Sequence, residues 1–167
     1  MSLSRFFLFL FVVVVGLEIG AGLYETLVVL PMWALNAPDS VVAFYQHNQA
    51  NPDFAINAGG RFWIFLTPLV GLVAIITLLT GLKTTGSHRK WRTAGTVIAI
   101  VVVTVTFAWF VPNLLRLLYH VPEMTSADIA TTANRWYVAN WGRVVVGMTA
   151  WLCGLRALSI SEKPALD

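Results

Sequence analysis

The stretch Trp136-Tyr137-Val138-Ala139-Asn140-Trp141-Gly142-Arg143 constrains the fold of this chain more than any other. On a helix with about 3.6 residues per turn, the side chains of Trp136, Asn140 and Arg143 share one face. The apolar run from Val144 to Leu158 indicates a membrane-spanning segment, and Arg143 lies roughly 12 Å inside it if the hydrocarbon begins near Arg135. A charge at that depth is costly, so we expect Arg143 to face the protein interior and to have a partner.

The composition of the whole chain also indicates a membrane protein. Only 11% of the 167 residues are charged and 57% are hydrophobic, whereas soluble domains carry about 25% charged residues. The single cysteine, Cys153, excludes an internal disulfide and a CxxC redox pair. The basic residues lie in the connections between apolar segments, where they report topology rather than nucleic-acid binding.

Four apolar stretches are each long enough for the roughly 20 residues that cross a bilayer as a helix. The sequence therefore predicts an all-α integral membrane four-helix bundle, a single domain over residues 1–167. The excess of lysine and arginine near the ends and between the second and third stretches places both termini in the cytoplasm and two long loops outside. The four predicted spans are residues 6–30, 62–82, 93–111 and 135–158.

Shorter elements are predicted in the outer loops. A short interfacial helix is expected from Asp39 or Ser40 to Gln49. If helical geometry resumes after Pro112, one face of that helix carries Trp109, Asn113, Arg116 and His120. Thr125 and Asp128 have the spacing of a capping box, so the fourth helix is expected to begin before the membrane.

Polar residues inside or next to the spans form the main constellation. Four short helices cannot keep so many polar groups apart, so we expect most of them to share a cavity in the outer half, where they bind or deprotonate a ligand. The alternative is that they only hold helices together through ion pairs and amide hydrogen bonds. The residues are Glu18, Glu25, Arg61, Asn113, Arg116, Asn140 and Arg143.

Aromatic and histidine residues allow further interpretations. Tryptophans toward the outer side suit an interfacial belt, or Trp109 and Trp136 stack a flat ligand on the polar faces. His47 and His120 are weak candidates for a metal site with Glu25, because neither has a paired ligand spacing. A solvated loop histidine is the alternative reading for both. The sequence predicts no cofactor, and it does not exclude a metal or haem.

Four short motifs resemble the anthrone-oxygenase-like membrane family. Gly22-Leu23-Tyr24-Glu25 before Leu30-Pro31 resembles its first-helix signature, and Val111-Pro112-Asn113 is similar to its motif closing the third helix. Trp136 with Asn140 and Arg143 resembles its fourth-helix pattern. In the outer loop, Phe44-Tyr45-Gln46-His47-Asn48 with Asn51-Pro52-Asp53-Phe54 resembles its pattern before an Asn-Pro element.

The resemblance implies a four-helix bundle and, for a few members, oxidation of a polycyclic anthrone to an anthraquinone by O₂ without metal or flavin. In such a mechanism we expect Glu25, and second Glu18, to act as general base, Arg143 and Arg61 to stabilise the enolate, and Asn140 to orient substrate or water. Trp109, Asn113, Arg116 and Trp136 would then contact the substrate. Two positions differ from the family pattern: Trp141 replaces a usual histidine, and Phe110 a usual asparagine.

The leading interpretation is a multi-pass protein of the bacterial inner membrane that acts as a cofactor-independent oxygenase on a polycyclic aromatic or phenolic substrate. One alternative is a non-catalytic carrier, or an accessory subunit, for a quinone-like or lipid molecule. Another is a metal-dependent membrane redox protein. The expected partners are an apolar or aromatic small molecule and membrane lipid, with homo-oligomers left open and no nucleic acid.

Overall fold

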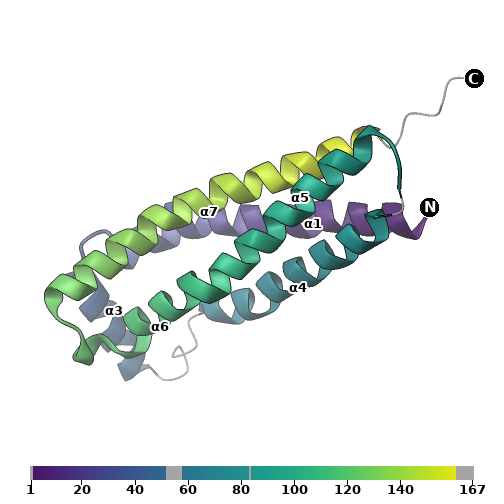
Figure 1. The fold of residues 1–167 in the computed structure, drawn as a ribbon. Helices are drawn as coiled ribbons and strands as arrows, with labels where there is room; N and C mark the ends of the chain where they lie inside the picture. Colours follow the sequence, from purple (N-terminus) through teal and green to yellow (C-terminus); the bar gives the residue numbers. More distant parts are fainter. Residues whose placement is uncertain (1, 52–57, 83, 161–167) are drawn as a thin grey trace, which may run out of the picture. The chain divides into compact units, whose positions relative to one another are not determined.

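A computed structural model of the chain describes residues 2–51, 58–82 and 84–160. The Pro52-Asp53-Phe54 part of the outer-loop resemblance lies outside these residues. The ribbon of the described segments contains helices and no strand (Figure 1). The all-α fold class is therefore confirmed.

Within the described residues, four helical segments are long and apolar enough to cross a membrane: Leu3–Trp33, Gly60–Gly81, Ser87–Tyr119 and Ser126–Ile160. They coincide with the four predicted spans and are longer at most of their ends. The third continues past Pro112 and beyond its predicted end at residue 111, and the second ends at Gly81, one residue before its predicted end. These segments identify a multi-pass helical membrane protein, whereas the orientation of its termini stays a prediction.

The first and third spans each contain one turn of π-helix directly before a proline. Helix α1 (Leu3–Tyr24) leads into η1 (Glu25–Val29) and then α2 (Leu30–Trp33). Helix α5 (Ser87–Val105) leads into η3 (Thr106–Phe110) and then α6 (Val111–Tyr119). At each junction an N–H bonds to the carbonyl five residues back, Leu30 to Glu25 and Val111 to Thr106.

The position of the two π-turns has a steric reason. Proline has no N–H, and its ring clashes with the carbonyl four residues earlier in a regular α-helix. For Pro31 and Pro112 that carbonyl belongs to Leu27 and Ala108, which lie inside η1 and η3. A wider turn relieves the clash and keeps the chain helical, and such π-turns are frequent at functional sites.

The remaining helices are α3 (Asp39–Ala50), α4 (Ala58–Gly81), η4 (Val121–Glu123) and α7 (Ser126–Ile160). The short helix predicted from Asp39 or Ser40 to Gln49 is thus confirmed, whereas its interfacial position stays a prediction. Thr125 caps α7, since its Oγ1 accepts the Asp128 N–H at 3.1 Å and donates to the Asp128 carboxylate at 2.7 Å. The predicted start of the fourth helix is confirmed as well.

Contacts divide the chain into two compact units. Unit 1 comprises residues 1–20, 66–103 and 145–167, and unit 2 comprises residues 21–65 and 104–144. The expectation of one domain over residues 1–167 stays a prediction.

In unit 1, a buried arginine holds the end of helix α4. The Arg92 Nε donates to the Thr77 carbonyl at 2.9 Å, and its Nη2 donates to the same carbonyl and to Thr80 Oγ1. Its Nη1 donates to Ser4 Oγ on α1. A Cβ on Gly81, the last residue of α4, would lie within 3.0 Å of the guanidinium carbon. Glycine at this position therefore gives the arginine its space.

In unit 2, the apolar core joins the ends of three spans to α3. Helix α3 contacts α2 and α6 (Figure 1). Trp33 stacks on Phe44, with ring centroids 5.5 Å apart. The buried core residues are Leu30, Trp33, Ala34, Val41, Phe110, Leu117, Val121, Ile129, Ala133 and Trp136.

Candidate functional site

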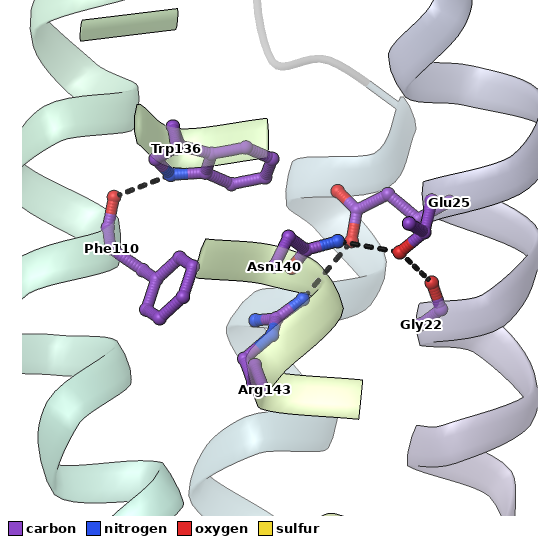
Figure 2. A network of polar contacts seen from close by, with 7 residues as sticks. Gly22, Glu25, Phe110, Trp136, Asn140 and Arg143 are labelled. Carbon is purple, nitrogen blue, oxygen red and sulfur yellow. Dashed lines mark hydrogen bonds and ion pairs between the residues drawn. The ribbon is translucent and has the colours of Figure 1, made fainter. Parts of the chain in front are cut away.

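The candidate site lies in unit 2 and is built around an ion pair between two spans. Arg143 Nη2 on α7 lies 3.3 Å from Glu25 Oε2 on η1 (Figure 2). The two side chains are 12% and 17% exposed, so the pair is largely, but not completely, removed from solvent. The expectation that Arg143 has a partner inside the protein is confirmed.

Two aromatic rings flank the guanidinium. The Arg143 Cζ lies 5.2 Å from the centroid of the Trp63 ring and 5.1 Å from that of Phe110. The Trp63 side chain also donates a hydrogen bond to the Glu25 carboxylate. Arg143 is thus held by one carboxylate and two π-faces, and its remaining N–H groups leave donor capacity for an anion.

A second polar contact connects the same two spans next to the ion pair. Asn140 Nδ2 donates to Thr26 Oγ1 at 2.6 Å, and Thr26 Oγ1 donates to the Gly22 carbonyl at 2.6 Å (Figure 2). Asn140 and Thr26 are both fully buried. This contact fixes α7 against the turn that carries Glu25.

The Asn140 amide has an unsatisfied acceptor. Its Oδ1 is buried and has no hydrogen-bond partner within the described part of the chain. Buried polar atoms in native proteins are nearly always paired, so an unpaired one needs an explanation such as a ligand or a bound water. The atom can accept a hydrogen bond from a donor that enters the site.

Trp136 lies on α7 one turn before Asn140, next to these polar groups (Figure 2). Its Nε1 donates to the Phe110 carbonyl at 3.1 Å, and its ring packs edge-on against that of Phe110 at 5.7 Å (Figure 2). It is only 2% exposed. In this structure Trp136 belongs to the apolar core, and it packs against Phe110, whose ring lies next to the Arg143 guanidinium.

The structure brings only some of the predicted residues together. Glu25, Asn140 and Arg143 form the site, whereas Glu18 belongs to unit 1 and is described apart from it. Arg61 and Arg116 are exposed. Asn113 uses its Nδ2 in a 2.7 Å bond to the Trp109 carbonyl one turn earlier, and Trp109 is partly buried.

The two histidines lie on the surface of unit 2. His47 is exposed on α3. His120 is exposed and places its Nδ1 3.2 Å from the Glu123 carboxylate. No group of three or more His, Cys, Asp or Glu side chains that could hold a metal occurs among the residues described.

Sequence reasoning did not assign Thr26, Trp63 and Phe110 to the site. Thr26 follows Glu25 directly and lies one turn after Gly22, a spacing that could have indicated a buried hydroxyl on the same face. From the sequence, Trp63 is one of the tryptophans toward the outer side that suit an interfacial belt. Phe110 was noted only as a departure from the family pattern, and its role depends on contacts between spans.

The fold and the site define a multi-pass helical membrane protein with a polar pair buried between spans. Comparison with family models, with curated proteins and with solved structures finds no match to this chain.

Proposed function

We propose that this membrane protein binds a flat phenolic or anthrone-like molecule at the Glu25–Arg143 site and oxidises it with O₂ without a cofactor. The family resemblance suggests this activity. The observation that supports it is the partly buried carboxylate–guanidinium pair itself, with Glu25 as base and Arg143 as the group that stabilises the anion.

A purely structural role explains this pair poorly. Burying an ion pair gives little net stability compared with well-packed apolar side chains. Inside a membrane span, ionisable groups most often mark a functional site. Both side chains keep some exposure, 17% for Glu25 and 12% for Arg143.

The pair suits proton abstraction because the charges stay balanced. When Glu25 takes a proton from the acidic C–H of the substrate, the carboxylate loses its charge and the substrate gains one on its enolate oxygen. Arg143 then pairs with the enolate instead of Glu25, and an environment that excludes water strengthens this interaction. Asn140 Oδ1 can accept a hydrogen bond from a phenolic hydroxyl of the same molecule.

The oxidation balances with O₂ as the only co-reactant. The carbanion of a methylene group adds O₂, and protonation gives a hydroperoxide, R₂CH–OOH. Loss of the remaining C–H proton and cleavage of the O–O bond release water and leave R₂C=O. One oxygen atom enters the product and the other leaves as water, so the substrate carbon supplies all four electrons.

Oxygen uptake tests the proposal. Protein purified in mild detergent is mixed with an anthrone, and the O₂ consumed is compared with the anthraquinone formed. We expect Glu25→Gln to lower the rate above the protein-free background by about 100-fold or more, as for loss of a general base. Glu123→Gln removes an exposed carboxylate from the same unit and is the matched control. A wild-type rate equal to background, or full activity in Glu25→Gln, would refute the activity.

The second candidate function is a non-catalytic carrier for a quinone-like molecule, and the unpaired Asn140 Oδ1 favours it. A carrier needs this acceptor but no proton transfer. It predicts that purified protein retains an aromatic ligand, that Asn140→Leu loses it, and that Glu25→Gln keeps it. Retention without oxygen uptake would select the carrier over the oxygenase.

A further inference from the structure

A groove in unit 1 lies at the start of the third span, and it belongs to a different unit from the Glu25–Arg143 site. It has a volume of about 780 Å³. We name it the α5 groove, since α5 (Ser87–Val105) supplies six of its eight lining residues. They are Thr85, Gly86, Arg89, Lys90, Thr93, Ala94, Val97 and Ile98.

The lining changes from polar to apolar along the helix. Thr85, Arg89 and Lys90 line the end where the span begins, and Val97 and Ile98 line the end deeper in it. Nine residues separate Arg89 from Ile98, which corresponds to roughly 13 Å at the helical rise per residue. A ligand that fills the groove therefore needs a polar head and an apolar tail.

The charge of the groove selects the sign of the head. Arg89 and Lys90 are both exposed. Arg92, one turn away, is buried and bonded to Ser4, Thr77 and Thr80, so it is not available to the ligand. Within the described residues of unit 1 the only carboxylate is Glu18, against five arginine and lysine side chains. The field at the groove is positive, and a negative head is favoured.

We propose that the α5 groove binds one anionic glycerophospholipid of the bilayer leaflet that it faces. The phosphate contacts Arg89 and Lys90, with the Thr85 and Thr93 hydroxyls as further donors, and an acyl chain lies along Ala94, Val97 and Ile98. Basic residues next to a span attract anionic lipid at about 1 kcal/mol for each charge near the surface. The apolar end of the groove also requires an acyl chain, which a free phosphate lacks.

Native mass spectrometry of delipidated protein in mild detergent tests this site. The probes are phosphatidylglycerol, phosphatidylcholine of the same chain length, and inorganic phosphate. We expect one phosphatidylglycerol to remain bound at concentrations where phosphatidylcholine does not. Arg89→Gln and Lys90→Gln should each weaken binding about fivefold, whereas Arg156→Gln, which removes an exposed cation of unit 1 outside the groove, should not.

A groove-filling variant separates a binding site from general electrostatic attraction. Ala94→Trp keeps both charges and occupies the apolar end, so it should also weaken phosphatidylglycerol binding. Equal binding of the two lipids, unchanged binding in Ala94→Trp, or displacement of the lipid by millimolar inorganic phosphate would each overturn the proposal. None of these outcomes bears on oxygen uptake at Glu25, so the two proposals are tested independently.

Discussion

Arg143 is the residue whose removal should disturb unit 2 most. Arg143→Gln leaves the Glu25 carboxylate buried without its counterion, and breaking one partner of a buried pair typically costs about 3 kcal/mol or more. We expect Arg143→Gln to lower the free energy of unfolding in detergent by about that amount. In the double variant Glu25→Gln with Arg143→Gln, most of the loss should be recovered, because no unpaired charge remains. Denaturant titration measures both effects.

The control for this cycle is Arg116→Gln, which removes an exposed cation from α6 and should change stability little. If the double variant were as unstable as the sum of the two single variants, the ion pair would not be the interaction that connects these residues.

Thr26 should contribute to the stability of unit 2 through the hydrogen bonds of its hydroxyl rather than through the volume of its side chain. Thr26→Val keeps the shape of the side chain but removes the acceptor for Asn140 Nδ2, which leaves a second unsatisfied polar atom in Asn140. The expected cost is about 2 kcal/mol, typical for a buried group that loses its partner. Thr26→Ser should retain most of the stability. Thr149→Val is the matched control, since Thr149 is exposed and bonds only to its own helix. Equal thermal stability of Thr26→Val and wild type would disprove this role.

At the scale of helices, the end of α4 depends on a side chain from α5. The last carbonyl groups of any helix lack intrahelical partners, and a cation there also suits the helix dipole. At this end of α4, Arg92 donates to the Thr77 carbonyl and to the Thr80 hydroxyl. We expect Arg92→Gln to destabilise the last turn of α4 by about 2 kcal/mol and to speed hydrogen exchange of its amides at residues 78–82.

Arg156→Gln serves as the control here, because that arginine is exposed on α7. Unchanged exchange in the α4 terminus of Arg92→Gln would show that Thr77 and Thr80 find other donors.

At the scale of the whole molecule, the testable property is the side of the membrane on which each connection lies. The distribution of lysine and arginine predicts that the termini and the loop at Thr85 face the cytoplasm, while His47 and Glu123 lie outside. With Cys153 replaced by serine, single cysteines at positions 47 and 123 should react with a membrane-impermeant maleimide in intact cells. Cysteines at positions 2 and 85 should react only after permeabilisation. The opposite pattern would reverse the topology and assign the α5 groove to the outer leaflet.

The length of the apolar stretches alone determined the four membrane-spanning helices of this protein. Four stretches of about 20 apolar residues can satisfy their backbone in lipid only as helices or closed barrels, and all four appear as helices. Local chemistry also determined the short helix α3, the Thr125 cap of α7 and the need of Arg143 for a partner. These features depend on residues close together in the sequence or on the cost of a single charge in a membrane.

Contacts between spans were decided only by the tertiary structure. Helical rise placed both Glu18 and Glu25 near the depth of Arg143, and the structure pairs Arg143 with Glu25. The π-turns before Pro31 and Pro112 break the 3.6-residue period on which facial predictions rely, so the contacts of Phe110 could not be assigned from spacing. Trp63 and Phe110 flank one guanidinium from two different helices. No single-helix pattern contains such a contact, because it exists only once separate helices pack together.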